Sequence, residues 1–185
     1  MSRVRLTLIA LGMAFALPAL AAADESLKAA SDQTLTGTWR SAPDELPLST
    51  SFDESVWGKN AKSVRTVEMV VRPTGDAMLT VTRKVVDGRG RTVPASTSIE
   101  HADIVLGPPE NSSDVRSDLA VTVKRAERRY PDDPSASWPL EGLKVGVATF
   151  PGASESIEVR VDFPEGRGSF WETLRRSNQP AQRRQ

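Results

Sequence analysis

Residue types that usually carry catalysis or bind metals are scarce in this chain. Its 185 residues include one histidine and no cysteine. Along a strand, His101 would share a face with Asp103, so the two could transfer a proton, but the sequence specifies no nucleophile nearby. A metal site needs more histidines or a carboxylate cluster of defined geometry. We therefore expect His101 to be an exposed strand residue, and we predict no catalytic residue, no metal site and no cofactor.

Three charged residues stand where apolar side chains would be expected. Arg83 and Arg125 extend the apolar alternations of two strands, and Glu172 lies among aromatic residues. If they point inward, they could pair with one another or with an anionic ligand such as a carboxylate, because a buried charge persists only when it is paired. The alternative is that the strand ends reach solvent and these side chains extend outward.

The N-terminal segment has the features of an export leader. Arg3 and Arg5 precede an apolar stretch over residues 6–17, and three alanines at 21–23 form a small-residue cleavage signature. The stretch is too short to span a bilayer. We therefore predict a cleaved signal peptide and a soluble periplasmic product.

Charge and cysteine content exclude several classes of partner and site. The chain has 24 basic and 24 acidic side chains, and without the two arginines of the leader the counts are 22 and 24, a net charge of −2. Basic residues are interleaved with acidic ones, whereas tight nucleic-acid binding needs a basic face. The arginines at 175, 176, 183 and 184 are typical of a solvated tail. Because there is no cysteine, lipid anchoring through cysteine and thiolate metal sites are excluded.

After the leader, eight segments alternate apolar and polar residues with the period of two that is typical of half-buried strands. They cover residues 34–41, 64–72, 77–86, 91–106, 119–124, 143–147, 157–163 and 169–175. Pro94 removes a backbone donor and predicts an edge or a bulge in the fourth strand. In the eighth strand two inward sets are open, Phe170 with Leu174 or Trp171 with Thr173.

Glycine- and proline-rich connections separate most of these segments. Residues 87–90 and 166–168 indicate hairpin turns rather than phosphate-binding loops, because no helix follows either of them. We expect a flexible connection over residues 107–118. Residues 131–139 are expected to form a loop whose Trp138 either contacts a partner or caps the core locally.

Short connections predict that successive strands pair antiparallel. Eight such strands can hide a shared apolar face by closing into an up-and-down barrel or by folding into a two-layer sandwich. Closure also removes exposed edges, which would template aggregation. We predict an all-β, eight-stranded antiparallel barrel, with the β-sandwich as the alternative. The interior of such a barrel is either filled by side chains or wide enough for one small ligand.

The first and last strands carry a family resemblance. Gly37, Thr38 and Trp39 resemble the Gly-x-Trp motif of lipocalins and the wider calycin barrels. In lipocalins the tryptophan packs across the closed end and a basic side chain near the end of the last strand lies over it; Arg175 or Arg176 stands at the comparable place. The family's Thr-Asp-Tyr element and its usual disulfide are absent from this chain.

The resemblance also implies a lid-like loop after the first strand, which corresponds to residues 42–62. Ser51 and Glu54 fit a capping box, and Gly58 is a candidate stop for a short helical turn. This segment either plugs the barrel end, with Trp57 touching a ligand, or simply covers the end of the core.

The chain is predicted to contain one folded domain, because removal of 23 residues leaves a length that suits a single sizeable core. The predicted parts are a signal peptide over 1–23, a linker over 24–33, a lipocalin-like β-barrel domain over 34–176 and a disordered tail over 177–185.

Three classes of function fit these observations. We predict a non-enzymatic periplasmic barrel that binds a small apolar or amphipathic ligand. The candidate contacts are Trp39, Trp57, Met69, Arg83, Arg125 and Glu172. The alternative is a protein-interaction module, such as an inhibitor of an exported hydrolase or an envelope assembly factor, with a filled interior and function in residues 42–62 and 107–118. An enzyme ranks last. Neither nucleic acid nor stable membrane insertion of the processed chain is expected.

Overall fold

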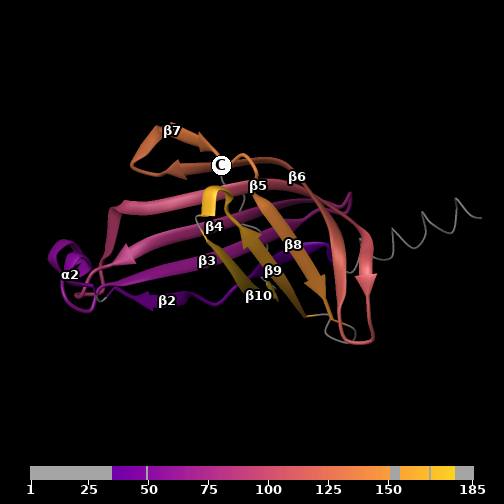
Figure 1. The fold of residues 1–185 in the computed structure, drawn as a ribbon, viewed down its shortest axis with the longest axis horizontal. Helices are drawn as coiled ribbons and strands as arrows, with labels where there is room; N and C mark the ends of the chain where they lie inside the picture. The colour runs from indigo at the N-terminus through magenta and orange to yellow at the C-terminus, as the bar shows by residue number, and fades with distance from the viewer. Residues whose placement is uncertain (1–34, 49, 151–154, 167, 178–185) are drawn as a thin grey trace, which may run out of the picture.

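The chain folds into one antiparallel sheet that is wrapped around an apolar core (Figure 1). The computed structural model describes residues 35–48, 50–150, 155–166 and 168–177. The elements are β1 (Gly37–Arg40), β2 (Asp44–Pro47), α2 (Ser51–Trp57), β3 (Lys62–Val71), β4 (Asp76–Val86), β5 (Thr92–Ser112), β6 (Ser117–Tyr130), β7 (Asp133–Pro139), β8 (Lys144–Thr149), β9 (Ser156–Asp162), the 3-10 turn η1 (Pro164–Gly166) and β10 (Ser169–Ser177).

Eight strands close into a barrel. The sheet order is β1-β10-β9-β8-β6-β5-β4-β3-β2, and β1 also pairs with β3, which closes the ring. Strands β2 and β7 lie outside this ring, β2 beside β3 and β7 beside β6. All pairings in the ring are antiparallel. Ring neighbours follow one another along the chain, apart from the pair of first and last strands, β1 and β10. The predicted up-and-down barrel is therefore confirmed, and the sandwich alternative is not adopted.

The barrel interior is filled by side chains. The largest side chains that keep under 2% of their surface exposed come from β1, β3, β4, β5, β9 and β10: Trp39, Met69, Leu79, Ile104, Ile157, Leu174, Val67, Val81, Val159 and Val161. A side chain with almost no accessible area borders neither solvent nor a void large enough for water. This part of the interior therefore offers no cavity for a ligand.

The first strand is shorter than the predicted 34–41, and the predicted lid-like segment begins with a second short strand. β1 and β2 pair with successive halves of β3, so residues 44–47, expected in a loop, extend the sheet instead. At the break between them, the amide of Ser41 donates to the Val67 carbonyl and its hydroxyl accepts from the Val67 amide, both at 2.9 Å. The side-chain hydroxyl thus replaces a backbone acceptor where the strand is broken.

Helix α2 follows β2 and begins one residue earlier than its capping box predicts. Thr50 is the N-cap, and its Oγ1 accepts from the Asp53 amide at 3.0 Å, so Thr50 takes the role expected of Ser51. Gly58 ends the helix at φ 84°, as predicted. No residue of α2 is buried, and therefore the helix does not plug the barrel.

Two segments expected to be loops are paired strands. β5 and β6 continue through residues 107–118 with register shifts at Pro109, where a missing donor interrupts the ladder, and turn only between Ser112 and Ser117. Residues 133–139 form β7 against the end of β6 (Figure 1). Within β4 and β5, a register shift opposite Pro94 confirms the predicted bulge.

In the last strand, β10, the structure shows which of the two predicted sets of side chains points inward. Phe170 and Leu174 are buried in the core, while Trp171 is 48% exposed, so the Phe170 set is the inner one. β10 includes Ser177, so the predicted tail cannot begin at residue 177. The predicted leader, the linker and residues 178–185 lie outside the described residues. Among the described residues, no helix has the length and apolar character needed to cross a membrane.

Candidate functional site

A layer of charged side chains lies inside the barrel at the end nearer α2, which we call the interior charged layer. Five strands contribute to it, at inward positions just beyond the apolar core. Its members are Arg65 on β3, Arg83 on β4, Glu100 on β5, Arg128 on β6 and Glu172 on β10. Arg65 and Arg83 are direct cross-strand partners, an arrangement of like charges that is unfavourable unless carboxylates compensate it.

Arg65 is compensated by two carboxylates. Its Nη2 lies 2.6 Å from Asp44 Oδ2 on β2 and 3.4 Å from Glu172 Oε2. Its guanidinium carbon lies 3.8 Å from the centroid of the Phe170 ring, so the cation also stacks on an aromatic face. Burial raises the pKa of Glu172 and the Asp44 charge adds to the rise, whereas Arg65 opposes it.

Arg128 and Glu100 form the most buried ion pair of the layer. The Arg128 Nε donates to Glu100 Oε1 at 2.9 Å, and Glu100 is 3% exposed. The other carboxylate oxygen of Glu100, Oε2, is buried and has no hydrogen-bond partner among the described residues. One acceptor in this layer is therefore unmatched.

Arg83 is the least compensated arginine. Within the described part of the chain its guanidinium makes no hydrogen bond, and its nearest carboxylate oxygen, Glu100 Oε2, is 4.0 Å from Nε. The rings of Phe163 and Phe170 lie 4.7 Å and 5.8 Å from its guanidinium carbon. Burial lowers the pKa of Arg83, and Glu100 opposes this effect. Its side chain nevertheless keeps 35% of its surface exposed, although its Nε is buried.

The structure brings together two of the six predicted contacts, Arg83 and Glu172, in the interior charged layer. Trp39 and Met69 are cross-strand partners inside the filled core, where a ligand has no access. Trp57 is half-buried at the end of α2.

Arg125 lies on the outer face, with 68% of its side chain exposed. The alternation predicted an inward register, but the pairing of β5 with β6 shifts between Asp103 and Ile104 and leaves Lys124 as an extra residue. One inserted residue moves every following side chain to the opposite face. The same bulge turns Arg128 inward.

Three members of the layer were missed by sequence reasoning: Arg65, Glu100 and Arg128. Arg65 stands in register with Val67 on β3, and Glu100 stands in register with Ala102 on β5, so alternation alone could have found both. For Arg128 no such signal exists, because its facing depends on the bulge at Lys124.

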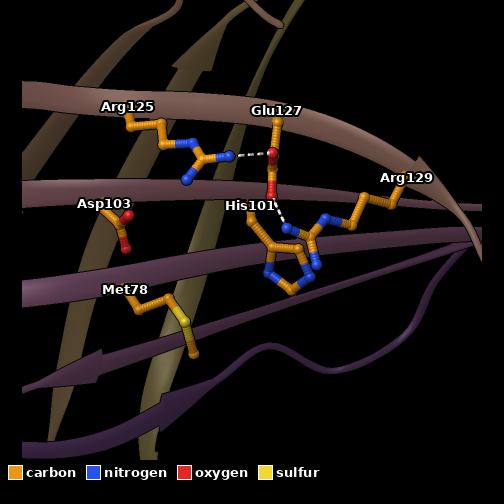
Figure 2. Close-up of a pocket in the computed structure, with 6 residues that line it drawn as sticks. All are labelled: Met78, His101, Asp103, Arg125, Glu127 and Arg129. Atoms are coloured by element: carbon orange, nitrogen blue, oxygen red, sulfur yellow. Dashed lines mark hydrogen bonds and ion pairs between the residues drawn. The ribbon is translucent and has the colours of Figure 1, made fainter. Parts of the chain in front are cut away.

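On the outer face, a surface pocket of about 280 Å³ surrounds the single histidine (Figure 2). It is lined by Met78, His101, Asp103, Arg125, Glu127 and Arg129. The Asp103 carboxylate lies apart from the His101 ring, whose Nδ1 is 3.2 Å from Thr80 Oγ1, so the two do not form a proton-transfer pair in this arrangement (Figure 2). Among the described residues, no group of three metal-ligating side chains is close enough to hold an ion.

Glu127 is the centre of the ion pairs in this pocket. Its Oε2 accepts from Ser137 at 2.9 Å and from Arg125 at 2.8 Å, and Arg129 pairs with its other oxygen. The Ser137 hydrogen bond and the two arginines lower the pKa of Glu127, against a smaller opposing effect of burial. Both arginines of the pocket thus already have a carboxylate partner.

The opposite end of the barrel carries the predicted contact between tryptophan and arginine. The guanidinium carbon of Arg176, rather than that of Arg175, lies 4.4 Å from the centroid of the Trp39 ring. Its Nη1 donates to the Thr36 carbonyl at 2.8 Å, and Trp39 Nε1 donates to the Leu35 carbonyl at the same distance. Gly37 has φ 135°, and a Cβ there would lie 3.2 Å from the Arg176 guanidinium. The motif thus closes this end, and Arg176 is not part of a solvated tail.

Comparison with known proteins adds one solved structure. No protein-family model matches the chain, and no curated protein matches it. A de novo designed fluorescence-activating β-barrel aligns at 17% identity over 80% of this chain and 97% of its own, with a TM-score of 0.31.

Proposed function

We propose that this protein is a non-enzymatic barrel that binds a small amphipathic ligand at its α2 end. The observation that carries the proposal is the state of Arg83, an inward and partly exposed side chain whose guanidinium makes no hydrogen bond within the described part of the chain. A guanidinium inside a protein whose N–H groups lack acceptors is costly, and a ligand that supplies an acceptor would offset this cost.

The filled core determines how much of a ligand the barrel could enclose. Next to the charged layer lie the rings of Phe163 and Phe170, and beyond them the interior is occupied by its own side chains. A long apolar molecule would therefore find no room along the barrel axis. Of the two predicted ligand types, the structure favours an amphipathic one that is held at the end.

The proposed location is the periplasm, and its support comes from the sequence of residues 1–23, with its basic start, apolar stretch and alanine cleavage signature. We propose that the processed protein is soluble, acts without catalysis, and has neither nucleic acid nor the membrane as a stable partner.

Native mass spectrometry of the protein purified from a bacterial periplasm tests this function. The expected result is a small-molecule adduct that disappears on denaturation and is lost in Arg83→Met. An Arg125→Met variant should keep the adduct, because that side chain lies on the outer face. An adduct-free wild type that also binds no added single-chain amphiphile would contradict the proposal.

A second function, protein interaction, is supported by a separate observation. Phe52 on α2 and Val115 at the β5–β6 turn are 72% and 73% exposed, and both lie in the two segments predicted to carry an interaction. A photo-crosslinker at residue 52 or 115, but not at residue 125, should then link one defined envelope protein or exported hydrolase. Equal labelling from all three positions would count against this function.

A further inference from the structure

The hydrogen bonds of the interior charged layer leave one guanidinium without an acceptor among the described residues. Two carboxylates, Asp44 and Glu172, share Arg65, and a third, Glu100, is hydrogen-bonded to Arg128. Arg83 is left with one contact of 4.0 Å to Glu100. With Asp44 included, three arginines face three carboxylates, and Arg83 is the arginine whose guanidinium is left without a hydrogen bond to any described residue.

The surroundings of Arg83 fix the orientation of that guanidinium. Phe163 and Phe170 flank it, and its Nε is buried, while part of the side chain remains open to solvent. Arginine presents its donors as a rigid planar fork that matches the two oxygens of a carboxylate. A planar anion with two acceptor oxygens would satisfy the donors that the chain itself leaves unmatched.

Neighbouring carboxylates limit the charge that this position accepts. The unpartnered oxygen of Glu100 is 4.0 Å from Arg83, and Glu172 belongs to the same layer. The Glu100 carboxylate at this range repels a second negative charge in a partly buried site. A group with one negative charge is therefore favoured over a phosphate monoester with nearly two.

We propose, on the basis of the proposed ligand-binding function, that the ligand is an amphipathic carboxylate whose head group is bound in a bidentate manner by Arg83. The apolar part of the ligand contacts Phe163 and Phe170 at the α2 end. Asp44, Glu172 and Glu100 keep Arg65 and Arg128 occupied, so that Arg83 alone receives the anion.

The test compares three probes of equal chain length: decanoate, 1-decanol and decyl phosphate. Binding to the purified protein, expressed from the full chain, is measured by titration calorimetry at neutral pH and moderate salt. Decanoate should bind at least tenfold more tightly than either of the other two. In Arg83→Met the preference for decanoate should disappear, and in Arg83→Lys, which keeps the charge without the fork, it should be reduced.

The matched control is Arg125→Met, which removes the same charge from the outer face and should leave all three affinities unchanged. Circular dichroism of each variant establishes that it is folded. If 1-decanol binds as tightly as decanoate, or if Arg125→Met has the same effect as Arg83→Met, the carboxylate assignment is wrong while the ligand-binding function stands. If wild type binds none of the three probes, the proposed function itself fails.

Discussion

Glu172 shows at the residue scale how burial couples charge to stability. Its carboxylate is held inside the barrel, where burial raises its pKa above the ordinary value of 4.5 despite the contact with Arg65. The folded protein therefore keeps a proton on this residue at pH values where the unfolded chain has lost it. By linkage, this residue contributes stability at low pH that is lost as the pH rises through the folded pKa.

The prediction at this scale concerns Glu172→Gln. We expect the difference in unfolding free energy, wild type minus variant, to fall as the pH rises from 4.5 towards 7, because only wild type loses the proton there. Urea denaturation of both proteins at closely spaced pH values measures this difference in unfolding free energy. Thr173→Ala, on the exposed face of the same strand, should give a pH-independent difference. If the difference for Glu172→Gln is constant or rises over this pH range, burial does not dominate the pKa of Glu172.

At the element scale, the turn between β4 and β5 is docked against the loop between α2 and β3. A Cβ added at Gly88 would lie 1.9 Å from the Lys59 carbonyl oxygen, so the two backbones touch. Gly90, in the same turn, has φ 79° and open space where its Cβ would be. The first glycine is needed for close approach and the second for its conformation.

Substitution of these two glycines should therefore have different consequences. Gly90→Ala is expected to cost about 1–2 kcal/mol of unfolding free energy through local strain alone. Gly88→Ala must push the Lys59 carbonyl away, and so it should also raise amide exchange at Asn60 and Ala61. Hydrogen-exchange mass spectrometry with both variants measures this. Equal exchange in the two variants would contradict the docking of turn and loop.

The strands themselves are where sequence reasoning worked best. Alternation located all eight barrel strands, because one face of each strand packs on a shared core and the other meets solvent. It failed for β7 and β2, which lie outside the ring and have no such alternation. It also failed beyond Lys124, since a bulge leaves no mark in a pattern of period two.

At the scale of the whole molecule, the filled barrel makes the strands depend on one another. Side chains from all eight barrel strands meet in one apolar cluster, and β1 must pair with both β3 and β10 to close it. A part of such a ring cannot open without exposing the core. We expect the barrel to unfold as one cooperative unit.

Leu174→Ala tests this cooperativity. Leu174 is 0% exposed, and removal of its side chain should lower the free energy of unfolding by about 2–5 kcal/mol. Unfolding transitions monitored by tryptophan fluorescence and by far-UV circular dichroism should shift together in the variant. The two transitions should coincide in both wild type and variant. Val115→Ala, at an exposed turn, should change stability by less than about 0.5 kcal/mol. Separate transitions for the two probes would show that the barrel opens in parts.

The sequence by itself determined the eight strands and the Gly37–Trp39 motif, because alternation and turn chemistry depend on neighbouring residues. It predicted a barrel but left a sandwich open, and the β1–β3 pairing of the tertiary structure decided for closure. Only the tertiary structure decided that the interior is filled and that five charged side chains meet near α2. Arg65 and Glu172 are 107 residues apart, and the facing of Arg128 depends on how β6 is paired with β5. A charge that lies next to its partner only after the ring has closed leaves no local signal in the sequence.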